Sequence, residues 1–211
     1  MRDHRRVPHR DWIPRVLAGA GVVAVSSALA AAGVPDWEES LFRTVHDLPD
    51  GLEPVLWAPM QLGSAVAPVL VGAGAAVVLR SWRPAVGAVV VGLGGWWLAK
   101  GVKELVERGR PYSVLSGLER RSGAPTDGLG FLSGHATVAF ALAAVLSPYL
   151  PRPARIGAYG LAGVVACARV HVGAHFPLDV IAGGAFGYTL GWLWHVAVGI
   201  PVDEMARYAK A

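Results

Sequence analysis

The sequence predicts an all-α integral membrane protein, a six-helix bundle formed by a single domain. Of its 211 residues, 54% are hydrophobic and only 16% are charged, and the mean hydropathy is +0.44. A soluble domain carries roughly 25% charged residues and about 45–50% apolar residues, so this chain is too apolar for that class. The 27 glycines and 15 prolines lie within apolar stretches and therefore do not indicate disorder.

Six stretches of the chain contain no Asp, Glu, Lys or Arg. A helix of about 20 apolar residues crosses the hydrocarbon core of a membrane, so each stretch is a candidate span. Prolines make the first half of the second stretch irregular, and its spanning part is expected to begin near Ser64. The third is expected to continue as a helix towards Glu107, and the fifth is long enough only if Arg169 lies at its end. The stretches are 16–35, 54–79, 84–99, 129–151, 156–168 and 180–202.

The charges between these stretches predict the orientation. Arg80 and Arg83 lie between the second and third stretches, Arg152 and Arg155 lie between the fourth and fifth, and further arginines precede the first. The connection from the first stretch to the second is acidic instead. By the positive-inside rule, both termini are expected in the cytoplasm. A signal peptide cleaved after residues 28–30 is an alternative interpretation of the first stretch.

We expect one membrane-embedded domain over residues 1–211, with cytoplasmic tails at about 1–13 and 203–211. The net charge of +4 does not indicate a nucleic-acid partner, because the basic residues do not form a polar face with interleaved aromatics. The single cysteine, Cys167, excludes a disulfide framework and a cysteine-based zinc site.

The connection from residue 100 to residue 128 departs from the charge rule. It is expected on the outer side of the membrane, where lysine and arginine are disfavoured. Binding of an anion would explain why positive residues are kept there. They are Lys100, Lys103, Arg108, Arg110, Arg120 and Arg121.

The first of three clusters at the outer ends of the spans combines Lys103 with Arg110 and Pro111. If the third span continues as a helix, Lys103 and Arg110 are two turns apart on one face, and Pro111 ends the helix. Two cations on one face suit a phosphate, which arginine can bind through two oxygens at once. The alternative is a pair of interfacial side chains that extend towards water.

The second cluster opens the fourth span with Ser133, Gly134 and His135. Ser133 is a plausible N-cap, and the first turn of a helix offers free backbone N–H groups to an oxyanion. His135 would then face the same place as a proton donor. The alternative is a capping serine beside a histidine with no chemical role.

The third cluster contains Arg169, His175 and Asp179. An aspartate that accepts a hydrogen bond from one imidazole nitrogen leaves the other nitrogen free to act as a nucleophile. A metal site is the alternative, because His171, His175 and Asp179 are four residues apart and would align on an unbroken helix. Pro177 is expected to interrupt that helix, and neighbouring cations would repel a metal ion.

In this order, the three clusters closely resemble the signature of the type-2 phosphatidic acid phosphatase superfamily. The resemblance covers about residues 103–179, and the six-span layout is similar to the membrane branch of the family. Two positions depart from it, because the family usually has proline at Leu132 and serine at Ala168. The second departure removes a hydroxyl that could contact phosphate, which bears on substrate preference more than on activity.

The resemblance implies a role for each residue. His175 attacks phosphorus and forms a phosphohistidine, Asp179 orients His175, and His135 protonates the leaving oxygen. The resemblance also implies that no metal or other cofactor is needed. The phosphoryl oxygens are held by Lys103, Arg110, Ser133, the Gly134 amide and Arg169.

These roles predict a lipid phosphatase whose site lies at the outer membrane interface, where a lipid head group can reach it. Polyprenyl diphosphate, phosphatidic acid and phosphatidylglycerol phosphate are candidate substrates, and the outer location favours the polyprenyl carrier. A phosphotransferase and a non-enzymatic lipid-phosphate binder or transporter are the alternatives. A carboxylate such as Asp179 beside an anion site argues against simple binding.

A glycine at every fourth position, at 183, 187 and 191, gives the last span a face of small residues. Such a face allows close approach of a neighbouring helix. The pattern favours a contact within the bundle, and a homodimer interface is the alternative.

Overall fold

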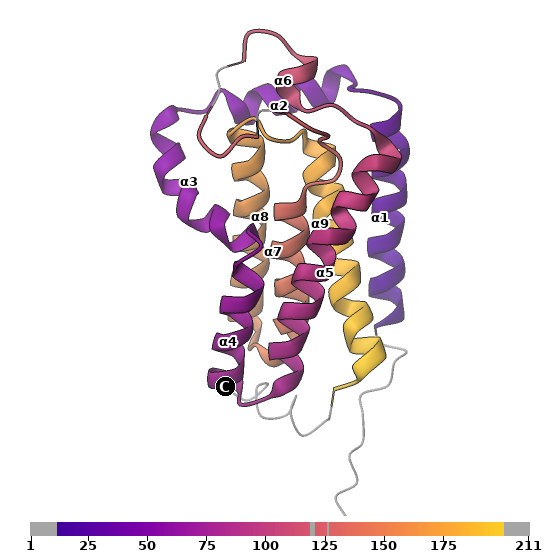
Figure 1. The fold of residues 1–211 in the computed structure, drawn as a ribbon, viewed down its shortest axis with the longest axis vertical. Helices are drawn as coiled ribbons and strands as arrows, with labels where there is room; N and C mark the ends of the chain where they lie inside the picture. Colours follow the sequence, from indigo (N-terminus) through magenta and orange to yellow (C-terminus); the bar gives the residue numbers. More distant parts are fainter. Residues whose placement is uncertain (1–11, 119–120, 126, 201–211) are drawn as a thin grey trace, which may run out of the picture.

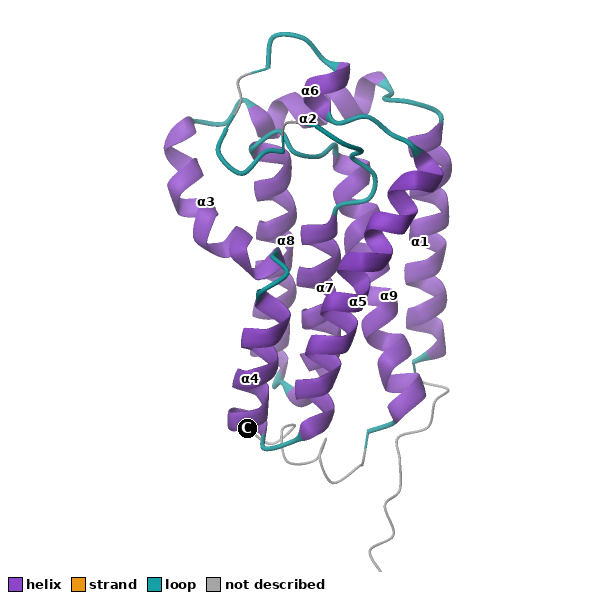
Figure 2. Ribbon diagram, viewed as in Figure 1, coloured by secondary structure: helices purple, strands orange, loops and turns teal. Residues whose placement is uncertain are grey.

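The computed structural model describes residues 12–118, 121–125 and 127–200, and within these ranges it contains helices and loops but no strands (Figure 2). The all-α prediction is therefore confirmed for this part of the chain. Residues 1–11 of the expected N-terminal tail, the arginines among them, the expected C-terminal tail and Arg120 lie outside the described residues, and Ile13, expected in the N-terminal tail, begins the first helix.

Six helices run along the length of the bundle, with α7 between several others (Figure 1). Helix α7 packs against α5, α8 and α9, while α1 packs on α9 and α4 packs on α5. The six helices are α1 (Ile13–Ala31), α4 (Ala67–Leu79), α5 (Trp82–Val106), α7 (Gly134–Leu146), α8 (Arg152–His171) and α9 (Pro177–Val198).

Shorter helices lie at one end of this bundle. Helices α2 (Asp36–His46) and α6 (Pro111–Val114) lie across that end, and α3 (Glu53–Met60) descends beside α8 (Figure 1). The segment of η2, α3 and η3 meets α4 at a bend of 71°. The 3₁₀ turns are η2 (Asp50–Leu52), η3 (Gln61–Gly63) and η4 (Ser147–Tyr149).

The predicted stretches correspond to the six long helices, with two differences. The second stretch is broken as expected, but its regular helix begins at Ala67, after the bend. The fourth begins as a loop, and its helix starts only at Gly134. By length and composition, two of the described helical segments can each cross a membrane, and the bent pair would make a third. The count of six spans stays a prediction.

Helix α2 is amphipathic, and its buried face holds it against the end of the bundle. Asp36, Glu38 and Glu39 lie in its first turn, where negative charge is favourable to the helix dipole. Its buried residues, Glu38, Phe42 and His46, are four apart and therefore share one face. Phe42 packs in an apolar cluster with Phe176, whereas Glu38 and His46 bring buried polar groups to the same face.

The glycine face of α9 packs against α7 within the chain. A Cβ atom at Gly187 would meet the backbone oxygen of Thr137, and one at Gly183 would meet that of Ser133. Only glycine lets the two backbones approach this closely. These glycines are thus used in a contact within the bundle. A homodimer stays a prediction, and this glycine face does not support it.

Candidate active site

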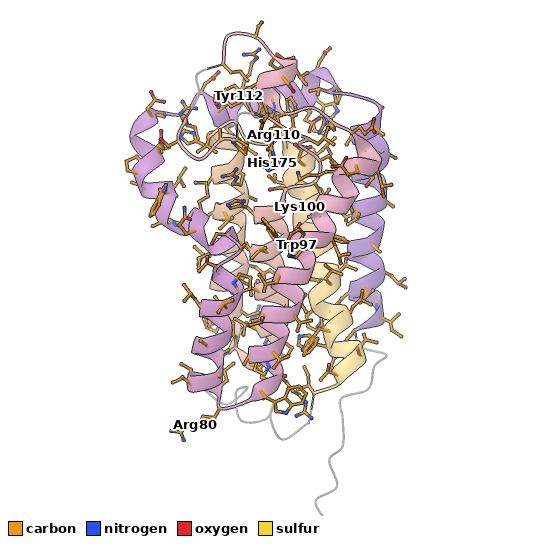
Figure 3. All side chains as sticks on the ribbon, viewed as in Figure 1. Arg80, Trp97, Lys100, Arg110, Tyr112 and His175 are labelled. Carbon is orange, nitrogen blue, oxygen red and sulfur yellow. The ribbon has the colours of Figure 1, made fainter. Side chains whose placement is uncertain are left out.

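His175 lies in the turn that joins α8 to α9. Helix α8 ends at His171, Gly173 adopts a positive φ of 76°, and α9 begins at Pro177. Proline is favoured in this first turn because its missing N–H is not needed there. The turn carries His175 to the same end of the bundle as Arg110 and Tyr112, far from Arg80 at the other end (Figure 3).

This turn removes the geometry on which the metal alternative depended. His171 is in the last turn of α8, where its Nδ1 atom is 3.1 Å from the carbonyl oxygen of Val45. His175 and Asp179 lie beyond the break in the helix, as Pro177 predicted. In the described part of the chain, no three His, Cys, Asp or Glu side chains are grouped as metal ligands.

Asp179 faces His175 from the first turn of α9. The Nδ1 atom of His175 is 3.5 Å from Oδ2 of Asp179, and both side chains are buried. This distance exceeds that of an ordinary hydrogen bond, and Oδ2 accepts one from the backbone N–H of Phe176 at 2.9 Å. Catalytic hydrogen bonds are often long in unliganded enzymes. The pair is therefore placed for contact, and the orienting role of Asp179 stays a prediction.

Ser133 is the N-cap of α7, as predicted, and its hydroxyl accepts a hydrogen bond from Ala136 N at 3.4 Å. Its own backbone N–H donates to the backbone oxygen of Asp179 at 2.9 Å. The start of α7 is thereby fixed to the first turn of α9. His135 follows two residues after Ser133, and a Cβ at Gly63 would lie 2.7 Å from the Cβ of His135. The bend between α3 and α4 thus packs directly against His135.

The prediction that Lys103 and Arg110 share one helix is wrong. Helix α5 ends at Val106, where Glu107 takes a left-handed conformation with φ 50°, and Arg110 is extended. Pro111 begins α6 instead of ending α5. A proline disfavours helical conformation in the residue before it, and it is well suited to the first turn of a helix.

Lys103 and Arg110 nevertheless contact the loops around the site. The Lys103 ammonium donates to the carbonyls of Leu129 and Gly130, at 3.2 and 2.8 Å. The Arg110 guanidinium donates to the carbonyls of Asp127 and Ala174, at 2.8 and 2.9 Å. Ala174 precedes His175, so Arg110 holds the turn that carries this histidine.

Arg169 comes to the site from the last turn of α8 and is 3% exposed. Its guanidinium donates to the Gly123 carbonyl at 3.0 Å and lies 3.1 Å from the Met60 sulfur. Lys103, Arg110 and Arg169 are here called the cation cluster. Over the described residues, none of the three forms an ion pair with a carboxylate.

The cation cluster acts electrostatically on His175. Burial lowers the pKa of His175 well below its ordinary value, and the positive charges of Lys103, Arg169 and Arg110, together with His135, lower the pKa further. An imidazole with such a pKa is neutral at physiological pH and keeps a lone pair. The structure thus brings all three predicted clusters together around a neutral histidine.

The two departures from the family pattern lie in apolar surroundings. Ala168 is fully buried in a cluster with Met60, Val172 and Ala174. Leu132 is fully buried in a cluster with Phe131 and Ala182, among others. Both side chains fit these surroundings.

Two charged residues near the site were missed as site residues by the sequence analysis. Arg108 donates to Asp179 Oδ1 at 2.9 Å, and Glu38 pairs with Arg108 on its other side. Glu38 was counted only as part of an acidic connection, and Arg108 only as one of several outer cations. The spacing of Glu38, Phe42 and His46 along one face of α2 was the available signal.

Comparison with known proteins supports the assignment. A sequence profile of the PAP2 superfamily matches residues 84–200, more than half of the chain. The chain belongs to the PAP2 superfamily. The matched range contains all of the predicted site residues, from Lys103 to Asp179. Membership confirms the resemblance found in the sequence and makes this membrane protein a phosphatase.

Two solved structures share the PAP2 fold of this chain. One is described as the first transmembrane PAP2-type phosphatidylglycerolphosphate phosphatase from Bacillus subtilis, with 24% identity, a TM-score of 0.64, and coverage of 83% of this chain and 93% of that chain. The other is LpxE from Aquifex aeolicus, with 21% identity, a TM-score of 0.64, and coverage of 74% and 92%. No significant match was found among curated protein sequences.

Proposed function

We propose that the protein hydrolyses a phosphomonoester or diphosphate carried by a membrane lipid, through a phosphohistidine at His175 and without a metal ion. The observation that supports this proposal is the cation cluster around His175. Its three members donate to neutral acceptors, so their positive charge is not offset by a carboxylate. Charge of this kind stabilises a phosphoryl group during transfer.

In the first step, the Nε2 lone pair of His175 attacks phosphorus while its Nδ1 proton faces Asp179. The bond between phosphorus and the lipid oxygen breaks, and His135 donates a proton to that oxygen as the lipid leaves. The cation cluster, the Ser133 hydroxyl and the Gly134 amide hold the other phosphoryl oxygens. The products are the dephosphorylated lipid and phosphorylated His175.

In the second step, a water molecule attacks the same phosphorus. His135, which has lost its proton, accepts one from the water, and the bond between phosphorus and Nε2 breaks. Inorganic phosphate leaves, and both histidines return to their starting protonation states. His135 thus gives up a proton in the first step and regains one in the second.

A lipid substrate is supported by an apolar groove between α8 and α9. The groove has a volume of about 460 Å³. Its lining residues on these two helices are Gly163, Ala166, Cys167 and Val170 of α8 and Pro177, Val180, Ile181, Gly184 and Ala185 of α9. Val170 directly follows Arg169, and Pro177 lies two residues after His175. A hydrocarbon chain in this groove would leave its phosphate near the cation cluster.

The proposed orientation places the site on the extracytoplasmic side. Arg80 lies at the end of the bundle opposite His175 (Figure 3), and Arg152 begins α8, the helix that ends next to the site. Arginines at the end opposite the site agree with a cytoplasmic location for that end.

The decisive experiment measures phosphate release by the purified protein in detergent from polyprenyl diphosphate, phosphatidic acid and phosphatidylglycerol phosphate. Phosphatidylglycerol phosphate is included because the Bacillus subtilis structure is named for its action on that lipid. We expect activity to survive exhaustive chelation and to be inhibited by vanadate, which mimics pentacoordinate phosphorus. Activity that is lost on chelation and restored by a divalent metal would contradict the proposed mechanism. Binding without phosphate release from any of the three would favour a lipid-phosphate binder.

Orientation is tested by labelling in intact cells. With Cys167→Ala as the background, a single cysteine at Ser122 is expected to react with an impermeant thiol reagent. A single cysteine at Arg152 is expected to stay unlabelled until the cells are permeabilised. The reverse pattern would place the site on the cytoplasmic side.

A further inference from the structure

Arg108 is a buried cation that the proposed reaction does not use. It lies two residues beyond the end of α5 and is 5% exposed. Its guanidinium donates to the backbone oxygen of Gly33 at 3.0 Å, to Oδ1 of Asp179 at 2.9 Å and to both carboxylate oxygens of Glu38. One side chain thus connects the ends of α1 and α5 to α2 and α9.

Glu38 holds Arg108 and α9 at the same time. Its carboxylate is fully buried, and its Oε1 atom also accepts a hydrogen bond from the backbone N–H of Leu178 at 2.8 Å. Leu178 precedes Asp179 in the first turn of α9. Glu38 therefore fixes both the guanidinium that contacts Asp179 and the backbone from which Asp179 projects. Glu38, Arg108 and Asp179 are here called the carboxylate clamp.

The carboxylate clamp fixes the direction of Asp179. Oδ1 is held by Arg108, and Oδ2 is held by the N–H of Phe176, so the carboxylate plane cannot rotate freely. Oδ2 is the oxygen that faces Nδ1 of His175. A fixed acceptor beside Nδ1 keeps the proton on that nitrogen and leaves Nε2 free for attack.

The charges of the carboxylate clamp do not cancel. Two carboxylates surround one guanidinium, which leaves one net negative charge next to His175. When Nε2 bonds to phosphorus, the imidazole ring acquires a positive charge, and the negative clamp stabilises it. Without Glu38, Arg108 would neutralise Asp179, and the ring would lose this compensation.

We infer that Glu38 and Arg108 are positioning residues of this active site, which act through Asp179 to orient His175 and to stabilise its phosphorylated form. The inference rests on the proposed function. Glu38 lies outside residues 84–200, the range that matches the PAP2 profile. The assignment therefore comes from the contacts of this chain.

The test compares Glu38→Gln with Glu39→Gln by single-turnover formation of phosphoenzyme. Glutamine keeps the size of the side chain and removes its charge. Glu39 is the matched control, because it is the next residue of α2 but pairs with Arg43 on a partly exposed surface. We expect Glu38→Gln to slow phosphoenzyme formation about 10–100-fold, by analogy with the loss of a partner that orients a metal-ligating histidine. The Glu39→Gln variant should form phosphoenzyme at the wild-type rate.

Two further measurements separate positioning from a merely structural role. Inhibition by inorganic phosphate reports the cation cluster, and its constant should change by less than about twofold in Glu38→Gln. Glu38→Asp restores the negative charge and should recover part of the rate that Glu38→Gln loses. A structural role would instead reduce the folded fraction and leave the rate per folded molecule unchanged.

If Glu38→Gln does not fold, Arg108→Lys gives the same test. Lysine keeps one positive charge but lacks the planar fork that donates to both carboxylates, so phosphoenzyme formation should again slow. A wild-type rate per folded molecule in whichever of the two variants folds would overturn the inference. A wild-type protein that forms no phosphoenzyme at His175 would refute the proposed function instead, so the two failures are distinguishable.

Discussion

Arg169 and Arg108 are both buried arginines at the same end of the bundle, but their partners differ in charge. Arg169 donates to a backbone carbonyl and lies against a methionine sulfur, whereas Arg108 donates to two carboxylates. A neutral acceptor holds a guanidinium in place without offsetting its charge. A carboxylate holds it and also cancels its charge. The difference teaches that burial alone does not single out a candidate anion-binding cation, and that the charge of its partners must be considered as well.

The largest expected effect separates the two histidines that face the cation cluster. His175→Ala should abolish turnover of every substrate, because the covalent intermediate cannot form. His135→Ala should slow phosphoenzyme formation by about 10²–10⁴-fold with a lipid phosphomonoester, the usual contribution of general acid catalysis. With p-nitrophenyl phosphate the loss should be small, because the leaving group is stable as an anion.

Single-turnover rates are the appropriate measurement, since the proposed mechanism also uses His135 in the second step. Equal losses on both substrates for His135→Ala would exclude it as the acid. Residual phosphoenzyme in His175→Ala would exclude that histidine as the nucleophile.

The next effect tests the two arginines directly. Arg169→Gln should lower kcat/KM by about 10²–10³-fold, as expected for loss of a group that stabilises transition-state charge. Its melting temperature in detergent should not fall, because the cation cluster is mutually repulsive. Arg108→Gln should lower the melting temperature, since removal of one partner from a buried ion pair costs about 3–5 kcal/mol.

Unfolding curves and kinetics on the same preparations check this prediction. A fall in stability for Arg169→Gln similar to that for Arg108→Gln would contradict the distinction drawn between their partners.

The local structure around the candidate site residues was predictable in part. Ser133 could be recognised as an N-cap, and Pro177 as an interruption of the helix, from local preferences alone. Membership of the PAP2 superfamily was predictable from the order of the three clusters along the chain. The apolar stretches also located the long helices to within a few residues.

The carboxylate clamp was not predictable in this way. Glu38 and Arg108 are 70 residues apart, and their contact depends on how α2 lies across the end of the bundle. Helix α5 ends at Val106, one residue from the expected end near Glu107, but its continuation to Arg110 was misjudged, because the sequence has no helix breaker from Val106 to Arg108. The helix ends where Glu107 takes a left-handed conformation, three residues before Arg110, whose helical conformation Pro111 disfavours.

A smaller effect concerns the dependence of kcat/KM on pH. Because burial and the cation cluster lower the pKa of His175, we expect no loss of kcat/KM through protonation of His175 as the pH falls through about 6.5, the ordinary pKa of histidine, and we expect that loss only at lower pH. Removing one nearby positive charge favours the protonated ring and raises its pKa. In Arg169→Gln the decline should therefore begin at a higher pH than in the wild type.

The measurement is the pH profile of kcat/KM with one soluble substrate, so that ionisation of the substrate is common to all variants. Arg155→Gln is the control, because Arg155 lies in the first turns of α8, away from His175. A decline at the same pH in Arg169→Gln and in the wild type would show that the cation cluster does not act on His175.

The smallest effect concerns the apolar groove. Ile181→Trp fills part of the groove and should raise KM for a long-chain lipid phosphate by about fivefold, which corresponds to roughly 1 kcal/mol of lost apolar contact. KM for p-nitrophenyl phosphate should not change. Val164→Trp is the matched control, since Val164 is similarly exposed on α8 but does not line the groove. Equal effects of the two substitutions would remove the groove as the site of the hydrocarbon chain.

The contact of Gly187 with the backbone of Thr137 also has a consequence for how this enzyme could be altered. His135 on α7 and His175 before α9 lie on two elements whose backbones meet directly at Gly187, where the atoms nearest to an added Cβ are all main-chain atoms of α7. A methyl group at Gly183 or Gly187 would push α7 and α9 apart. It would thereby change the distance between the two histidines without contacting either of them. The distance between the two histidines therefore depends on glycines deep in the bundle as well as on the loop contacts around the site.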